Sequence, residues 1–446
     1  MSKTTLNALR NGDLVGAHAL TLREGLTEFP REIFGLADTL EVLDLGGAGL
    51  TDLPDDLGRL AKLRVLFCSG NPFTRLPPSL GDCAALSQVG FRGCGISEVP
   101  AEALPPALRW LTLTDNAIET LPDALGQRPL LQKVMLTGNR LAALPESLAG
   151  HARLELLRLS SNRLDALPPW LAEMPRLAWL AWTGNPFDRD APASGRSVAW
   201  SAVRVERQLG EGASGQVHEA LWTDGGETRA VALKLFKGAM TSDGLPEREM
   251  AACLAAGAHP NLTGALGRLA DHPDQIQGLL MPLAPTGWRV LAGPPSLETC
   301  SRDVYDPVLR LDPGVALRIA RDVATGAAHL HARGLSHGDL YAHNTLWDGT
   351  TGQAMLSDFG GTSFLPDGPG DPLRGLDVLA WGLLLGELLE RRDDASSIPA
   401  GLLDLHRQCT AAKPANRPAM AEVVDTLSAF RLEPRAGLAS APSTDL

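Results

Sequence analysis

Three glycines and one lysine in the second half of the chain have the types and spacing that suit phosphate chemistry. Gly210, Gly212 and Gly215 lie in the sequence G-E-G-A-S-G. Glycine allows backbone N–H groups to approach phosphate oxygens closely, because no side chain blocks the way. Lys234 follows in V-A-L-K, and the chain has only six lysines against 34 arginines. A phosphate-binding lysine therefore has few candidates, and Lys234 is the one that we favour.

The glycine pattern alone fits an ordinary turn or a dinucleotide-binding loop, and the latter needs a helix directly after it. The next segment, residues 217–222, favours a strand instead. Asp224-Gly225-Gly226 then supplies a tight turn to a third strand, residues 231–234. We therefore expect the glycines to lie in a β-hairpin and not before a helix.

A second group of chemistry-bearing residues lies further along the chain. Asp339 and Asn344 occur in H-G-D-L-Y-A-H-N, and Asp358 begins the sequence D-F-G. Carboxylate and amide oxygens are the ligands that Mg²⁺ prefers. A magnesium ion beside a bound phosphate suits phosphoryl transfer, which depends on positioning and on neutralisation of phosphate charge.

The order of these motifs resembles that of the protein kinases, and the resemblance covers residues 200–432. It implies an ATP site in which Lys234 binds phosphate and pairs with Glu249 on a following helix, Glu247 being a less suitable alternative. Apolar walls, a gating residue and a hinge would surround the adenine beneath the glycine loop. The matching positions are Leu209, Val217, Ala232 and Leu346 for the walls, Met281 for the gate, and Pro282, Leu283 and Ala284 for the hinge.

The resemblance also assigns roles within the catalytic loop. Asp339 would be the catalytic base that orients the attacking hydroxyl, Asn344 would bind Mg²⁺, and Asp358 would be the main Mg²⁺ ligand. Asp377 matches a buried aspartate that anchors the loop, and Arg417 matches a late structural arginine. The helix before the loop is expected to begin at residues 312–313 with an aspartate cap and a first-turn proline, and to end at the glycine at position 334.

The catalytic loop departs from the family pattern at several positions that bear on the substrate. Gly338 replaces an arginine, which in regulated kinases pairs with a phosphate on the activation segment. Tyr341 and His343 stand where serine/threonine and tyrosine kinases place a lysine and an arginine, respectively. His343 either supplies the missing cation or only packs against the loop. No A-P-E motif lies between Asp358 and Asp377, so the segment that docks peptides in the family is abbreviated. The sequence H-G-D also resembles the loop of aminoglycoside and choline kinases, which phosphorylate small molecules.

The first half of the chain is an internal repeat of 22–24 residues. Each unit reads L-x-x-L-x-L-x-x-N-x-L-x-x-L-P-x-x-L, which is similar to the leucine-rich repeat, with about eight units between residues 17 and 187. Alternate residues of L-x-L point inward from a short strand, and stacked units bury that face in a curved solenoid. The recurring asparagine is expected to bond turn backbone, and residues 1–16 to form a polar cap. The marker prolines are Pro30, Pro54, Pro77, Pro100, Pro122, Pro145 and Pro168.

A column of side chains is expected on the concave face of this solenoid. Exposed aromatic residues on such a face suggest an interface. A protein partner or substrate could bind there. Alternatively, the column packs on the second domain or on another copy of the chain in a homo-oligomer. The column is Val42, Val65, Gln88, Trp110, Lys133, Leu156 and Trp179, with Phe67, Met135 and Arg158 beside it.

Composition narrows the class of protein. The chain has 446 residues, is 44% hydrophobic and 21% charged, and carries a formal net charge of −12. Two or three globular domains are expected, and nucleic acid is a poor partner for so acidic a chain. The longest apolar stretch, residues 376–389, is shorter than the about 20 residues that span a bilayer, and no secretory signal is seen. Six scattered cysteines indicate reduced thiols, so a cytoplasmic location is expected.

We therefore predict an α/β leucine-rich repeat solenoid over residues 1–190, a linker at 191–199, a bilobal α+β protein kinase-like domain at 200–433 and a flexible tail at 434–446. The whole resembles a bacterial-type leucine-rich repeat kinase. It should use ATP and Mg²⁺ to phosphorylate a protein, on serine or threonine rather than tyrosine. The alternatives are a catalytically weak or inactive scaffold and a small-molecule phosphotransferase. The polar linker predicts that the two domains fold separately.

Overall fold

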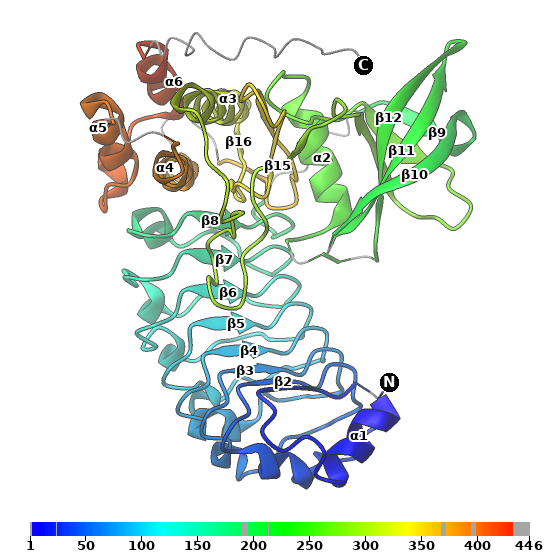
Figure 1. The fold of residues 1–446 in the computed structure, drawn as a ribbon, viewed down its shortest axis with the longest axis vertical. Helices are drawn as coiled ribbons and strands as arrows, with labels where there is room; N and C mark the ends of the chain where they lie inside the picture. Colours follow the sequence, from blue (N-terminus) through cyan, green and yellow to red (C-terminus); the bar gives the residue numbers. More distant parts are fainter. Residues whose placement is uncertain are drawn as a thin grey trace, which may run out of the picture.

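The computed structural model describes residues 2–23, 25–188, 195–212, 214–238, 240–241, 243–366, 372–393 and 398–430. The predicted tail and the first part of the predicted linker lie outside these residues. Figure 1 shows a curved ladder of short strands with a two-lobed domain seated at its C-terminal end. The predicted fold class, a repeat solenoid followed by a bilobal kinase-like domain, is confirmed.

Eight three-residue strands form one parallel sheet along the solenoid, in chain order. The middle residue of each strand is buried, which is the pattern that the L-x-L repeat predicts. The strands are β1 Ala19–Thr21, β2 Val42–Asp44, β3 Val65–Phe67, β4 Gln88–Gly90, β5 Trp110–Thr112, β6 Lys133–Met135, β7 Leu156–Arg158 and β8 Trp179–Ala181. Helix α1, Ser2–Arg10, precedes them.

Single 3₁₀ turns return the chain between strands, and most of them begin directly after a marker proline. Proline suits this position because its fixed φ and missing N–H cost nothing at the start of a helical turn. The turns are η1 Arg31–Leu36, η2 Leu57–Arg59, η3 Pro78–Asp82, η4 Ala101–Ala103, η5 Asp123–Leu125, η6 Glu146–Leu148 and η7 Pro169–Glu173.

The recurring asparagine joins adjacent repeats, as predicted. Asn139 Nδ2 donates to Leu113 O and to Leu136 O, both at 2.9 Å, while its Oδ1 accepts from Ile118 N at 3.1 Å. The same pattern recurs at Asn162. These bonds satisfy backbone groups that the short strands leave unpaired inside the solenoid.

The first lobe of the second domain is a six-stranded sheet in the order β10-β11-β12-β14-β13-β9. Three long antiparallel strands, β10 Val203–Glu211, β11 Gly215–Asp224 and β12 Glu227–Phe236, form consecutive hairpins. The predicted hairpin position of the glycines is therefore correct. The lobe also contains β9 Ser197–Ala199, η8 Trp200–Ala202, α2 Pro246–Ala256, β13 Gly267–Ala270 and β14 Gly278–Pro282.

The second lobe is mainly helical. Helix α3, Pro313–Ala332, begins as predicted, with the Asp312 carboxylate accepting from Gly314 N at 2.7 Å. Helices α3 and α4 are packed together, with α5 and α6 on the outer side (Figure 1). The remaining elements are β15 Arg289–Val290, β16 Leu335–Ser336, β17 Thr345–Trp347, β18 Ala354–Leu356, β19 Ser363–Phe364, α4 Arg374–Glu390, α5 Ala400–Cys409, η9 Pro414–Asn416 and α6 Met420–Ser428.

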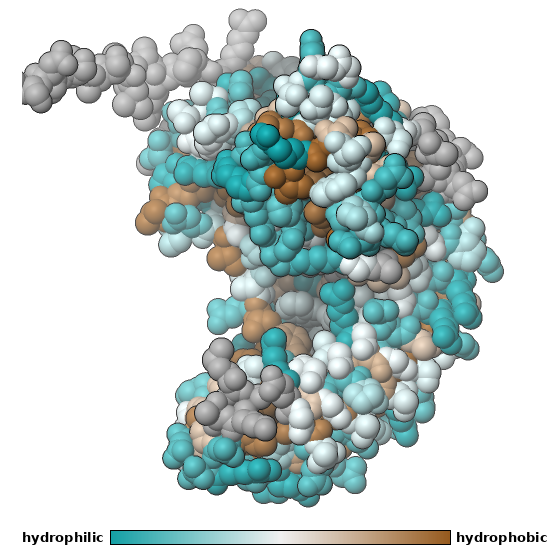
Figure 2. Space-filling view, turned by 90° about the vertical axis from the view of Figure 1, so that its right-hand side faces the viewer, coloured by the Kyte–Doolittle hydropathy of each residue, from teal (hydrophilic) through white to brown (hydrophobic). Residues whose placement is uncertain are grey.

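The two domains share hydrophobic cores, which the expectation of separate folding did not include. Leu365, Leu373 and Leu376 of the second domain are buried in the core of the repeats. Conversely, Leu156 and Trp179 of the repeats are buried in the core of the second domain. The end of a solenoid needs a cover for its last apolar layer, and here the second domain provides it. Figure 2 shows the molecule hollowed on one side between this domain and the first repeats.

Candidate phosphotransfer site

A buried ion pair lies at the centre of the candidate site. Lys234 on β12 donates to Glu249 on α2, and its Nζ lies 3.9 Å from Asp358 Oδ1. Burial opposes the charge on Lys234, but the carboxylates of Asp358 and Glu249 outweigh it and raise the pKa of the lysine. Burial raises the pKa of Glu249 to about 7. The structure thus brings together three residues that the motifs assign to phosphate and metal binding.

The sheet register places most of the predicted pocket walls on one face. Val217 is paired with Lys234, and Ala232 is paired with Met281. Directly paired residues point to the same side of a sheet, and so do residues two apart on one strand. These four side chains therefore share the face that carries the lysine. Leu209 lies in the irregular part of β10 and is 40% exposed, as the rim of an open pocket would be.

The remaining predicted pocket residues come from both lobes. Leu346 is half-buried on β17, next to β15 and β18 in a small sheet of the second lobe. Pro282 ends β14, and Leu283 and Ala284 continue from it as the connection toward the second lobe. The connection between the two lobes therefore begins at Pro282, and the hinge and floor roles of these residues stay predictions.

The three loop glycines differ in how closely the surrounding atoms pack against them. A Cβ built on Gly215 would lie 2.4 Å from Leu235 O, so glycine is needed there for the two strands to pack. Cβ atoms at Gly210 and Gly212 would meet nothing within 4 Å. These two positions are therefore free of packing demands, which is compatible with a loop that closes over a ligand.

Asp377 anchors the catalytic loop, as the resemblance implied. Its buried carboxylate accepts from the backbone N of His337 at 2.8 Å and of Gly338 at 3.0 Å, and also from Ser336 Oγ at 3.0 Å and His331 Nε2 at 2.9 Å. Burial works against its ionisation, but these donors outweigh it and lower the pKa of Asp377. The loop is thereby held to the N-terminal turn of α4.

Asp339 and Asn344 face each other across this loop. Asn344 Nδ2 donates to Asp339 Oδ2 and to Asp339 O, both at 2.9 Å. Both bonds use the side-chain nitrogen Nδ2, which leaves the side-chain oxygen Oδ1 of Asn344 for a metal ion. The Asp358 side chain is 47% exposed, whereas that of Asp339 is 14% exposed. One amide oxygen and one open carboxylate fit Mg²⁺, which completes its shell with phosphate and water.

His343 does not join this group. Its Nδ1 lies 2.7 Å from Asp303 Oδ1, and its backbone N donates to Asp303 Oδ2 at 3.0 Å. Burial opposes the charge on the imidazole, but the Asp303 carboxylate outweighs it and raises the pKa of His343. The ring also packs against Tyr341, with centroids 4.8 Å apart. Asp303 thus engages the cationic edge of His343, which the sequence-based hypothesis had directed to phosphate.

The cationic side chain that hydrogen-bonds to Asp339 is that of Arg158, on strand β7 of the repeats. Its Nη2 donates to Asp339 Oδ1, its Nη1 to Gly338 O at 3.0 Å, and its Nε to Asp243 Oδ1 at 2.7 Å. From the sequence, Arg158 is expected beside the concave column, with no role in the site. The sequence does carry one signal of a special role for Arg158. No other strand of the repeats ends in a basic residue.

Much of the predicted concave column is covered by the second domain. The Trp179 indole stacks on Tyr341, with centroids 4.2 Å apart and planes 8° apart, and donates to Leu340 O at 3.0 Å. Gln88 donates to Leu297 O, and Arg109 donates to the backbone at residues 298–299. Of the two open alternatives for this column, packing on the second domain accounts for its C-terminal half.

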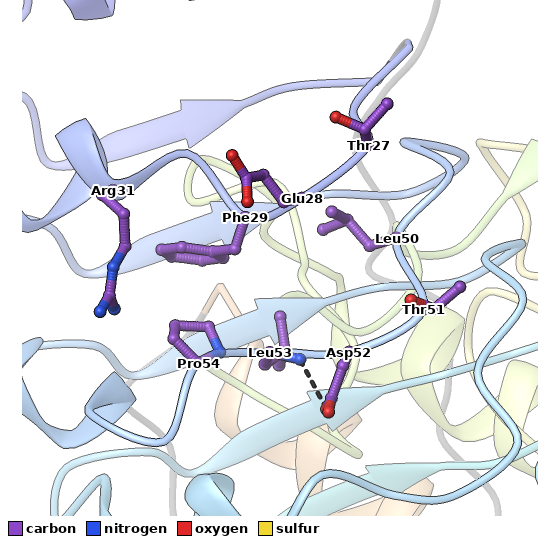
Figure 3. Close-up of a pocket in the computed structure, with 9 residues that line it drawn as sticks. All are labelled: Thr27, Glu28, Phe29, Arg31, Leu50, Thr51, Asp52, Leu53 and Pro54. Atoms are coloured by element: carbon purple, nitrogen blue, oxygen red, sulfur yellow. Dashed lines mark hydrogen bonds between the residues drawn. The ribbon is translucent and has the colours of Figure 1, made fainter.

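Other features of the described residues offer no competing site. Figure 3 shows the residues that line a pocket in the first repeats, and none of the candidate phosphotransfer residues is among them. Within the described ranges, no group of three or more His, Cys, Asp or Glu side chains could hold a metal ion, and no helix has the length and apolarity to cross a membrane. All six cysteines are free and buried. The pocket is lined by Thr27, Glu28, Phe29, Arg31, Leu50, Thr51, Asp52, Leu53 and Pro54.

Comparison with known proteins agrees with this geometry. Residues 203–366 match the family of protein tyrosine and serine/threonine kinases, and residues 62–83 match the leucine-rich repeat. Over 181 residues, 40% of this chain, the sequence is 26% identical to a probable serine/threonine-protein kinase of Encephalitozoon cuniculi, and the match spans 30% of that protein's length. The chain joins a leucine-rich repeat domain to a protein kinase-like domain.

Proposed function

We propose that the chain transfers the γ-phosphoryl group of ATP to a serine or threonine hydroxyl of a protein. The observation that carries the proposal is the convergence of Lys234, Glu249 and Asp358 on one side of the site and of Asp339 and Asn344 on the other. Phosphoryl transfer needs little more than such positioning and charge neutralisation. The match to a probable serine/threonine kinase supports serine or threonine as acceptor.

Each residue has a defined task in this proposal. Lys234, held by Glu249, binds the phosphates of the nucleotide. The oxygen of the acceptor hydroxyl bonds to the γ-phosphorus while the bond from that phosphorus to ADP breaks. Asp339 accepts the proton that the hydroxyl loses. Mg²⁺, when bound at Asp358 and Asn344, neutralises phosphate charge. The Asp358 carboxylate is 47% exposed and is therefore open to a metal ion and a nucleotide.

A second candidate, a nucleotide-binding scaffold, is favoured by one observation. Arg158 and the stacked pair of Trp179 and Tyr341 cover the acceptor side of the catalytic loop, and the Asp339 side chain is only 14% exposed. A large protein segment has little room to approach there. A small hydroxyl compound would meet less obstruction, which keeps a small-molecule phosphotransferase as a further outcome to be tested.

The test is incubation of the purified chain with γ-labelled ATP, Mg²⁺ and a mixed protein acceptor, followed by phosphoamino acid analysis. We expect label on phosphoserine or phosphothreonine, and no label with Asp339→Asn at the same protein concentration. Label recovered only in added small hydroxyl compounds would replace the protein acceptor by a small one. Bound nucleotide without any transfer would leave the scaffold as the function.

A further inference from the structure

The kinase-like domain is incomplete on the side of its catalytic base. Gly338, Tyr341 and His343 occupy the positions where kinases place cations, and among the described residues none of these three donates a side-chain hydrogen bond to Asp339. Tyr341 stacks on Trp179, and His343 pairs with Asp303. Among the described residues, Asp339 receives side-chain hydrogen bonds from Asn344 and Arg158, and only Arg158 is charged.

Arg158 is held as a built part of the site. Its side chain is 2% exposed, although arginine is rarely buried unless it is paired. The guanidinium bridges Asp339, Asp243 and the Gly338 carbonyl, so it joins the catalytic loop to the segment before α2. A planar guanidinium suits this task because its donors are fixed in a fork.

Gly338 is fitted to the repeat strand that lies against it. Its φ is +66°, in the left-handed region that favours glycine. A Cβ there would lie 2.6 Å from Leu180 O of β8 and 2.4 Å from Gly361 O. An arginine at this position, as in the family, would therefore collide with the repeat domain. Glycine leaves the room that the repeat domain needs to dock there.

The docking of the two domains buries apolar side chains from both. Leu365, Leu373 and Leu376 complete the repeat core, and Trp179 belongs to the core of the kinase-like domain. Separation would expose these apolar side chains to water, which is strongly unfavourable. The docked arrangement, with Arg158 on Asp339, is therefore the stable one.

We propose that Arg158 is a positioning residue of the phosphotransfer centre, and that the repeat domain thereby completes the kinase-like domain. This inference rests on the proposed function. The guanidinium orients the Asp339 carboxylate toward the acceptor hydroxyl. The cation missing from the catalytic loop is thus supplied from the other domain of the same chain.

The experiment compares the full-length chain with Arg158→Gln, Arg158→Lys and, as a matched control, Arg163→Gln. Arg163 is exposed in the same repeat. We expect Arg158→Gln to lower kcat about tenfold or more, with nucleotide affinity unchanged. Arg158→Lys keeps the charge but loses the fork, so it should fall between. Arg163→Gln should match the wild type.

An unchanged or raised kcat in Arg158→Gln would overturn the proposal, and a raised value would make the contact inhibitory. If the wild type transfers no phosphate, the proposed function fails by itself. A double-mutant cycle of Arg158→Gln and Asp339→Asn on the denaturation midpoint then still tests the pairing. Additive shifts in that cycle would show that the two side chains do not interact, and non-additive shifts would support the contact.

Discussion

Restoring the family arginine's Cβ at Gly338 should disrupt the protein. In Gly338→Ala the residue keeps a φ near +66°, which costs a residue with a Cβ about 1–2 kcal/mol. The new Cβ would also press on Leu180 O and Gly361 O, two backbone atoms that cannot rotate away, and such overpacking adds about 1–3 kcal/mol. The sum is about 2–5 kcal/mol, a large part of a typical folding free energy of about 5–15 kcal/mol.

The assay is thermal and denaturant unfolding of Gly338→Ala beside a matched control, Gly334→Ala. Gly334 has a φ of +72°, but a Cβ there meets nothing within 4 Å. The control therefore carries only the backbone cost. A chain of 446 residues that melts as one unit shifts by about 1 °C per kcal/mol, so Gly338→Ala should melt about 2–5 °C below the wild type and also below the control. Equal melting of the two variants would refute the claim that β8 closes on the catalytic loop.

Two further predictions concern single side chains of the site. Asp358→Ala should abolish Mg²⁺-ATP turnover, because the half-exposed carboxylate of Asp358 is the main proposed ligand of the metal; retained turnover would contradict the magnesium assignment. His343→Gln should cost about 1–3 kcal/mol of unfolding free energy, and most at low pH. The raised pKa of His343 means that its bond to Asp303 contributes fully below about pH 6.5 and fades as pH rises through the higher folded value. A pH-independent difference in denaturation between wild type and His343→Gln would contradict this pairing.

The repeat and the kinase-like lobes could be predicted because their signals are local. The repeated leucines and Asn139-type residues recur with one period, and each motif from Gly210 to Asp358 lies within a single loop or strand. The position of Lys234 opposite Glu249 followed from motif order alone. Local patterns of this kind are the part of a fold that sequence reasoning reaches.

The docking of the two domains could not be predicted in the same way. Arg158 and Asp339 are 181 residues apart, and no periodic pattern links them. The polar linker suggested separate units, whereas Leu365, Leu373 and Trp179 show shared cores. At Gly338 and Tyr341 the sequence shows only that the basic residues of the family pattern are missing. The physical reason for these departures, a repeat strand and an indole lying against the loop, exists only in three dimensions.

The most direct test of a single catalytic unit is to cut the linker in the otherwise intact protein. A protease site inserted between residues 189 and 194 allows cleavage after folding, followed by native gel filtration and a turnover assay. The two halves should co-elute as one particle of about the uncut mass, 47.2 kDa, and keep their phosphotransfer rate, because the shared cores and Arg158 hold them together. Separation of the halves with activity retained in the kinase-like half alone would contradict the account.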